Sequence, residues 1–319
     1  MKLLKNSMEF IKYENTIKGF GGRRHHDRSI LDGDGKSVVA GPVPVVNVSE
    51  KNDRLGGAAN VAANVASIGG QVGLLAIIGD DENGRYLEGA LEKQNIKNYL
   101  LRSLTSPTTV KIRVVAQHQQ MLRCDFEAPP STSDVESVLE EFSRIVKDFD
   151  VVIFSDYGKG VLTKVSQMIE ICNQNDIPCF VDPKGNDYSK YNGSTAITPN
   201  KSELRQIVGP WNSEEELIGK ASSLRDKLNL KYLVLTRSEE GVSLFSSEGV
   251  QNIKATAKEV FDVSGAGDTV IAVMATLFAN DCSFEKATYW ANKAAGIVVG
   301  KFGTAVIDAD ELFSQVINE

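Results

Sequence analysis

Short runs of consecutive apolar residues, separated by segments of helical character, constrain the fold of this chain more than any other feature. The runs typical of strands occupy residues 72–78, 151–155, 179–182, 196–198 and 232–236. Strands that are apolar on both faces belong to a parallel sheet that helices cover on both sides. The alternation therefore predicts an α/β fold with a mostly parallel central sheet.

Two segments predict helices that provide this cover. A run of small residues favours a helix over residues 57–68. Apolar residues also recur at helical spacing further along the chain, and they predict a helix with one apolar face. That face comprises Val135, Val138, Leu139, Phe142, Ile145 and Val146.

Two regions interrupt the alternation. Residues 43–48 form an apolar run, and residues 109–126 hold two strand-like runs on either side of His118-Gln119-Gln120. Consecutive strands without a crossover helix predict an antiparallel hairpin. We expect both regions to form a small β lid beside the main sheet. Because the chain has no repeat, low-complexity tract or linker, we expect residues 1–319 to form one domain.

The charge balance excludes some classes of partner. The chain carries 35 Lys and Arg against 42 Asp and Glu, a net charge of -7, so bulk charge does not favour binding of nucleic acid. An anion site must therefore be a local pocket. No stretch approaches the roughly 20 apolar residues that span a bilayer, and the first residues are too polar for a secretory signal. We expect a cytoplasmic protein with no membrane partner.

A glycine-rich segment carries the strongest chemical signal. Residues 261–270 (FDVSGAGDTV) lead into an apolar helix, so Gly265, Ala266 and Gly267 place amide groups at a helix N-terminus, which favours a phosphate or a developing oxyanion. Asp268 fits two roles. It is a favourable acid in a first helical turn, or a base that takes a proton beside the anion site. The spacing alone leaves both roles open.

Three motifs, in this order, resemble those of the ribokinase-like (PfkB) carbohydrate kinases. They are Gly56-Gly57-Ala58-Ala59-Asn60, Asn200-Lys201-Ser202-Glu203 and residues 262–268, and the resemblance covers roughly residues 41–310. It implies a ribokinase-like three-layer fold with a small β lid. Within the family, the blocks RLGGAANVAANVASIGG, QQMLRCDFE, SDYGKGVL, VDPKGNDYSKY and TPNKSE are similar to heptose 7-phosphate kinases. This similarity implies ATP-dependent phosphorylation of the anomeric hydroxyl of D-glycero-β-D-manno-heptose 7-phosphate, a step toward ADP-heptose and the lipopolysaccharide core.

The resemblance also implies roles for single residues. Asp268 would be the base, and the amides of residues 265–267 would surround the transferring γ-phosphoryl. Asn200 and Glu203 match the family's N-x-x-E motif, which organises Mg²⁺ near ATP. The expected nucleotide-binding residues are Lys184, Asn200, Glu203, Thr236, Ser238, Gly241 and Asn292. For Lys184, a solvated lysine in a turn is an equally good interpretation.

Gly56, Gly57 and Asn60 match the sugar-binding signature of the family. A sugar that already bears a phosphate also needs cations, for which arginine is the better bidentate partner. The remaining candidates for the acceptor site are Asp27, Lys111, Arg113, Arg123, Asp125, Asp156 and Lys159. Each also has a plainer interpretation, as a solvated lysine or arginine of a strand or as an acid of a turn or strand end. The resemblance further implies a possible homodimer.

Residues 1–40 depart from the family pattern. Asp27 lies at the expected distance before Pro42, but residues 13–24 offer only Tyr13, Ile17 and Phe20 as apolar residues of a first strand. We therefore expect a strand position that is empty, short or poorly packed. Two alternatives follow. The chain is a kinase for another small sugar such as fructose or ribose, or a non-catalytic binding protein whose pocket was lost at residues 1–40.

Overall fold

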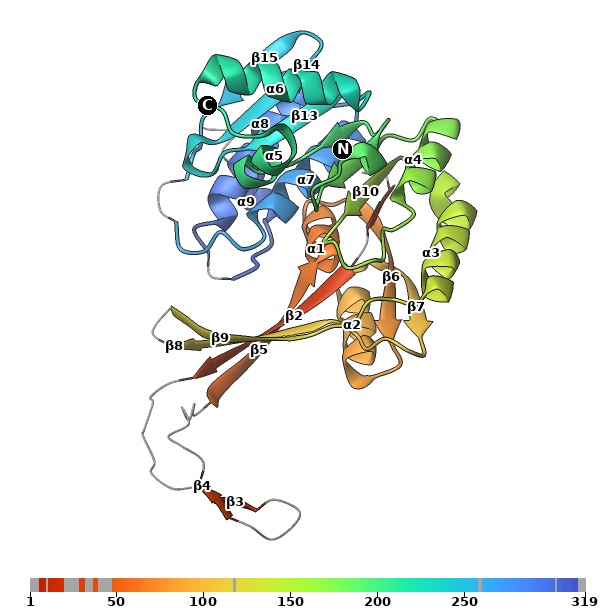
Figure 1. The fold of residues 1–319 in the computed structure, drawn as a ribbon, viewed down its shortest axis with the longest axis vertical. Coiled ribbons are helices and arrows are strands. Elements are labelled where there is room, and N and C mark those ends of the chain that lie inside the picture. The colour runs from red at the N-terminus through yellow and green to blue at the C-terminus, as the bar shows by residue number, and fades with distance from the viewer. Residues whose placement is uncertain are drawn as a thin grey trace.

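The computed structural model describes residues 6–9, 11–19, 29–31, 37–39, 48–116, 119–257, 260–301 and 303–314. Within these ranges, nine strands form a central sheet with helices on both faces (Figure 1). The strand order is β15 (Gly249–Ile253), β14 (Val242–Ser246), β13 (Tyr232–Thr236), β12 (Ala196–Ile197), β11 (Cys179–Asp182), β10 (Val151–Ser155), β1 (Asn6–Glu9), β6 (Gln71–Gly79) and β7 (Lys97–Ser103). All pairs from β13 to β7 are parallel, whereas β14 and β15 are antiparallel.

Helices cover the apolar strands and complete three layers. One layer contains α1 (Ala58–Ser67), α7 (Ala266–Phe278) and α8 (Phe284–Val298), which contact one another. The other helices are α2 (Glu82–Lys93), α3 (Thr132–Ile145), α4 (Val165–Gln174), α5 (Lys201–Val208), α6 (Glu214–Lys227) and α9 (Ala309–Ser314). Short 3₁₀ turns lie at Val146–Asp148, Ser189–Tyr191 and Ser238–Glu240. Because α7 contacts α1, α8 and the sheet, its residues from Asp268 to Thr276 are buried, and most of them are apolar.

The sequence predicted much of the central sheet and of the helices that cover it. The strands over residues 151–155, 179–182 and 232–236 have the expected bounds, and the small-residue helix is α1. The apolar face predicted for the next helix is also confirmed, because Val135, Val138, Phe142 and Ile145 of α3 are buried. None of the helices in the described ranges is long and apolar enough to cross a bilayer.

A second sheet of four strands projects from this body as the lid (Figure 1). Its order is β5 (Val48–Gly57), β2 (Ile11–Gly19), β8 (Val110–Ala116) and β9 (Gln119–Phe126). The antiparallel pair of β8 and β9 confirms the hairpin expected over residues 109–126. Of the other expected lid strand, residues 43–47 lie outside the described residues, and β5 begins at Val48. A separate hairpin pairs β3 (Ser29–Leu31) with β4 (Ser37–Val39).

The N-terminal segment is divided between the two sheets. The central position between β10 and β6 is filled by β1, which has only four residues, as expected for a short strand. Of residues 13–24, which we considered and found unsuited to this strand, residues 13–19 belong to lid strand β2. The physical reason is their alternating polar and apolar pattern, which suits a sheet with a solvated face rather than a doubly buried strand. The candidate sugar ligand Asp27 lies outside the described residues.

Candidate active site

The candidate residues gather at the carboxyl edge of the central sheet. Asp156 follows β10, Asp182 ends β11, Asn200 follows β12 and Thr236 ends β13. Because these strands are parallel, their carboxyl ends share one edge, where α/β proteins commonly bind ligands. The lid rises from the same region through β5, whose last residues Gly56 and Gly57 lead directly into α1.

The start of α7 is the candidate anion site. Gly265 is its N-cap, with a φ of 83°, and a Cβ atom there would lie 2.9 Å from Asn60 Nδ2. Glycine is therefore required both by the left-handed backbone and by the close approach of Asn60. The Gly265 and Gly267 amides have no hydrogen-bond partner among the described residues. The Ala266 amide was also expected in the anion site, but it donates to the Val263 carbonyl at 3.2 Å.

Asp262 holds the loop that precedes this helix. One carboxylate oxygen accepts a hydrogen bond from the Ser264 amide at 2.9 Å, and the other accepts one from the Gly303 amide at 3.0 Å. The glycine-rich turn is thus tied to the segment that follows α8. Such bracing favours a preorganised arrangement of the amides at the helix N-terminus.

The Asp268 carboxylate is buried in the first turn of α7, with 9% of its surface exposed. Its two oxygens accept hydrogen bonds from separate elements. Asn60 Nδ2 donates to Oδ2 at 2.8 Å, and the Tyr157 hydroxyl donates to Oδ1 at 3.0 Å. Asn60, which we expected to contact the sugar, thus contacts the candidate base. The arrangement fixes the carboxylate beside the free amides, where a base for an attacking hydroxyl belongs.

A second asparagine, Asn64, supports this contact. It is fully buried, and its Nδ2 donates to the Asn60 carbonyl at 2.8 Å. Its Oδ1 accepts from Thr269 Oγ1 at 3.2 Å and from the Ile307 amide at 3.1 Å. The sequence interpretation missed Asn64. The available signal was a pair of asparagines four positions apart on an otherwise apolar helix.

Asp182 is the second residue that the sequence interpretation missed. Burial raises the pKa of its carboxyl well above the ordinary value, and the carboxylates of Asp268 and Glu203 raise it further. Lys184 and the Thr198 hydroxyl act in the opposite direction. The Asp182 carboxyl is therefore close enough to interact with both of the other carboxylates, which makes this edge of the sheet attractive to a cation.

Asn200 and Glu203 form a reciprocal capping box at the start of α5. Asn200 Oδ1 accepts from the Glu203 amide at 2.9 Å, and Glu203 Oε2 accepts from the Asn200 amide at 3.0 Å. The other Glu203 oxygen accepts from Lys184 Nζ at 2.8 Å, and this hydrogen bond raises the pKa of Lys184. Lys184 is therefore paired with the N-x-x-E motif, and half of its side chain is exposed.

The residues expected around the nucleotide also lie near one another. The Thr236 amide donates to the Pro199 carbonyl at 3.0 Å, which places Thr236 beside Asn200. Ser238, with a φ of 54°, opens the turn that Gly241 closes. A Cβ atom at Gly241 would lie 2.1 Å from the Ile253 carbonyl oxygen, so only glycine fits. Asn292 Nδ2 donates to the Lys254 carbonyl at 2.8 Å, so Gly241 and Asn292 flank the same segment.

The expected lid cations face one another across β8 and β9. Lys111 lies opposite Asp125, and Arg113 lies opposite Arg123. Lys111 Nζ is 2.5 Å from Asp125 Oδ2, and Arg123 Nε is 2.9 Å from Asp125 Oδ1. These cations lower the pKa of Asp125, with the Lys111 hydrogen bond as the largest cause. An arginine directly opposite another arginine is unfavourable unless an anion lies between them.

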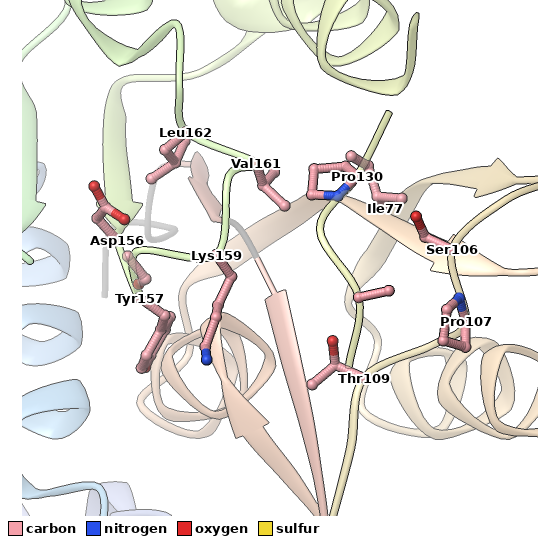
Figure 2. A pocket seen from close by; sticks show the side chains of 12 residues that line it. Ile77, Ser106, Pro107, Thr109, Pro130, Asp156, Tyr157, Lys159, Val161 and Leu162 are labelled. Atoms are coloured by element: carbon pink, nitrogen blue, oxygen red, sulfur yellow. The ribbon is translucent and has the colours of Figure 1, made fainter. Parts of the chain in front are cut away.

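Lys159 connects the turn after β10 to this lid. Its Nζ pairs with the Glu127 carboxylate, just beyond the end of β9. Figure 2 shows Lys159 and Tyr157 extending the same way from this turn, whereas Asp156 points in the opposite direction. The adjoining pocket, lined by Thr109, Pro130 and Lys159 among others, has a volume of about 50 Å³. It accommodates a few water molecules but not a sugar.

Comparison with known proteins decides the family. The sequence pattern of the family described as "pfkB family carbohydrate kinase" matches residues 33–310 of the chain. The chain belongs to the pfkB family of carbohydrate kinases. This result confirms the resemblance recognised in the sequence and makes the chain a carbohydrate kinase by family.

Close relatives of this pfkB chain have curated names. A D-beta-D-heptose 7-phosphate kinase of Bordetella bronchiseptica is 46% identical over 274 residues, which are 86% of this chain and 88% of the relative. The Bifunctional protein HldE of Haemophilus influenzae is 47% identical over 276 residues. That alignment covers 86% of this chain but only 58% of the bifunctional protein.

Solved structures support the ribokinase-like fold. Phosphofructokinase-2 from Escherichia coli superposes with a TM-score of 0.77 at 17% identity, covering 99% of this chain and all of the other. A ribokinase from Arabidopsis thaliana gives a TM-score of 0.74 at 17% identity, with 98% of each chain covered. At this identity, the likeness concerns the fold alone.

Proposed function

We propose that this pfkB-family kinase transfers the γ-phosphoryl group of ATP to the anomeric hydroxyl of D-glycero-β-D-manno-heptose 7-phosphate and forms the 1,7-bisphosphate. The observation that carries the proposal is the geometry of Asp268, a buried carboxylate held by Asn60 and Tyr157 beside free amides of α7. The identity of 46% to a D-beta-D-heptose 7-phosphate kinase supports the choice of acceptor.

In this mechanism, Asp268 takes the proton of the anomeric hydroxyl as its oxygen attacks the γ-phosphorus. The new O–P bond forms while the bond from the γ-phosphorus to the bridging oxygen breaks, and ADP leaves with that electron pair. The Gly265 and Gly267 amides lie where the helix dipole stabilises negative charge on the transferring group. Base and anion site both belong to the first turn of α7, so one rigid helix holds their relative position.

We also propose that the kinase uses Mg²⁺ with ATP. In the described ranges, no cluster of three or more histidine, cysteine or acidic side chains could hold a metal by itself. Mg²⁺ requires no such cage, because it binds one or two carboxylates, several waters and the substrate phosphates. Asn200 and Glu203 offer oxygen atoms beside the repelling carboxyl of Asp182, so the donor chemistry fits. When bound, the ion neutralises phosphate charge.

The lid supports an acceptor that bears a phosphate. Around Asp125 and Glu127 the described residues place four cationic side chains, those of Lys111, Arg113, Arg123 and Lys159. Lys111, Arg123 and Lys159 pair with these two carboxylates, and a sugar phosphate, which carries close to two negative charges at neutral pH, would add an anion beside the cations. The opposed arginines provide the bidentate donors that suit a phosphate.

We further propose that the kinase is a homodimer that pairs through its lid. Strand β9 is an edge strand of the lid sheet, and Met121, Leu122 and Phe126 on it are each more than half exposed. An edge strand with exposed apolar side chains favours pairing with another chain. Light scattering on a sizing column tests this proposal, and a monomer at all accessible concentrations would contradict it.

The decisive experiment measures ATP consumption with a panel of acceptors. The panel contains heptose 7-phosphate, the unphosphorylated heptose, fructose, ribose and fructose 6-phosphate, with and without Mg²⁺. We expect the highest kcat/KM for heptose 7-phosphate, and ³¹P NMR should show a new anomeric phosphate. A better unphosphorylated acceptor would overturn the choice of substrate, and no turnover with any acceptor would favour a non-catalytic binding protein.

A further inference from the structure

Tyr157 contacts the candidate base from the turn that also carries Asp156 and Lys159, although the sequence interpretation gave Tyr157 itself no role. It lies in the turn that follows β10, and its hydroxyl donates to Asp268 Oδ1 at 3.0 Å across 111 positions of sequence. The other carboxylate oxygen accepts from Asn60 on α1. Two neutral donors from opposite directions therefore orient the carboxylate.

The turn that carries Tyr157 is itself firmly held. The Asp156 carboxylate is buried, and its Oδ1 accepts from the Gly158 amide at 2.7 Å. Its Oδ2 accepts from Lys190 Nζ and from the Tyr191 hydroxyl, each at 2.7 Å. Both oxygens of Asp156 thus anchor the turn, and its expected contact with a sugar hydroxyl stays a prediction.

The turn points its neighbouring side chains in opposite directions. Figure 2 shows the Asp156 side chain directed away from Tyr157. The main chain is also fixed, because the Asp156 amide donates to the Asp182 carbonyl at 3.0 Å and Gly158 adopts a φ of 67°. A residue that positions a catalytic group must itself be held rigidly. The buried contacts of Asp156 hold the turn, and Tyr157 presents its hydroxyl from that turn.

We propose that Tyr157 is a positioning residue for phosphoryl transfer, whose hydroxyl orients the Asp268 carboxylate and keeps it ionised. The inference rests on the proposed function, in which Asp268 is the base. A hydroxyl that donates to a carboxylate stabilises its charged form, and it also fixes the direction in which the carboxylate oxygens face. Among the described groups around Asp268, the Asp182 carboxyl on β11 interacts electrostatically with it, so an ionised Asp182 would oppose ionisation of Asp268. The two neutral donors offset that repulsion.

The test is Tyr157→Phe, which removes the hydroxyl and keeps the ring. We expect kcat to fall about tenfold, or about 1.4 kcal/mol, with KM values for ATP and acceptor changed less than about twofold. Loss of the donor favours the protonated carboxyl, so the acidic limb of the kcat/KM profile should move to higher pH by about one unit. The matched control is Tyr99→Phe on β7, where the ring packs against Phe149, and it should change none of these quantities.

A double mutant separates this inference from the proposed function. If Tyr157 acts through Asp268, Tyr157→Phe should have no further effect in an Asp268→Asn background. A tenfold loss in both backgrounds, or an unmoved acidic limb, would overturn the positioning role. Full activity of Asp268→Asn would instead overturn the base assignment. Tyr157→Phe could also lower the melting temperature while the folded protein keeps its kcat and pH profile. That result would make Tyr157 a purely structural residue and contradict the inference.

Discussion

The Asn60 amide nitrogen lies 2.8 Å from Asp268 Oδ2, although 208 positions separate the two residues. Asn60 belongs to the first turn of α1, and α1 follows lid strand β5 without a linker. The lid is therefore continuous with α1, whose Asn60 donates to the candidate base on α7. This continuity explains why a glycine pair, Gly56 and Gly57, stands at the junction, where Gly57 adopts a φ of 56°.

Replacing the candidate base tests the chemistry most directly. Asp268→Asn is nearly isosteric but cannot take the hydroxyl proton, so kcat should fall by several orders of magnitude while ATP and sugar still bind. Steady-state rates and isothermal titration on one preparation check this. A variant that retains more than about a tenth of the wild-type kcat would remove Asp268 from the role of base.

The two glycines at the start of α7 should differ sharply in their tolerance of alanine. A Cβ atom at Gly265 meets Asn60 Nδ2 at 2.9 Å on a left-handed backbone, whereas at Gly267 it meets nothing within 4 Å. We expect Gly265→Ala to lower kcat at least about tenfold and to cost about 1–3 kcal/mol of stability. Gly267→Ala should lower kcat and stability much less. Equal losses in melting temperature and kcat for the two variants would contradict this account of the turn.

The lid arginines should affect the acceptor more than the nucleotide. Arg113→Ala or Arg123→Ala removes charge-assisted hydrogen bonds to a phosphate, so KM for the phosphorylated sugar should rise about 10- to 100-fold. KM for ATP should change little. Arg144→Ala on α3, which breaks only a surface pair with Glu141, is the control. If KM for both substrates rises equally, the arginines serve folding rather than recognition.

Asn64 should contribute to both stability and activity. Asn64→Ala removes a buried acceptor from the Ile307 amide and the Thr269 hydroxyl. It also removes the hydrogen bond that Asn64 donates to the Asn60 carbonyl. We expect a loss of about 3 kcal/mol in the free energy of unfolding, measured in urea, together with a lower kcat. Asn173→Ala, whose amide bonds to Gly193 at the surface, should cost less than about 1 kcal/mol. Similar losses for both variants would refute the network.

Asp81 should make stability depend on pH. Burial raises the pKa of this carboxyl, but hydrogen bonds from the Thr108 and Gly84 amides outweigh burial and hold the pKa below its ordinary value. A lowered pKa stabilises the folded state above the unfolded value of about 4, and this stabilisation is lost as the pH falls through the folded pKa. Asp81→Ala should therefore cost about 2 kcal/mol at pH 7 and progressively less toward pH 3.

The matched variant for this effect is Asp81→Asn. The asparagine side chain would keep one acceptor for the helix cap but does not titrate. The free energy of unfolding of Asp81→Asn should therefore lie between those of wild type and Asp81→Ala at pH 7, and its difference from Asp81→Ala should be nearly independent of pH. Urea unfolding of the three proteins between pH 7 and pH 3 provides the comparison. A constant difference between wild type and Asp81→Ala across this range would contradict the role of the charge.

The sequence alone predicted five strands of the central sheet, β6, β10, β11, β12 and β13, and the location of the candidate anion site. Strands such as β10 and β13 are apolar on both faces, and this pattern fits only a sheet covered on both sides. Gly265 and Gly267 precede an apolar helix, and this local pattern is enough to predict free amides. The first amides of any helix lack partners within the helix, whatever the tertiary structure around it. The same segment singled out Asp268, but the choice of the base as its role came only from the family resemblance and stays a prediction.

Only the tertiary structure decided which side chains meet Asp268. Asn60, Tyr157 and Asp182 converge on it from three elements, and their approach depends on the strand order, in which β1 enters between β10 and β6. The division of the N-terminal segment between β1 and lid strand β2 also depends on this pairing. Local sequence cannot encode such contacts, because burial and hydrogen bonding between distant residues arise only when the whole sheet has assembled.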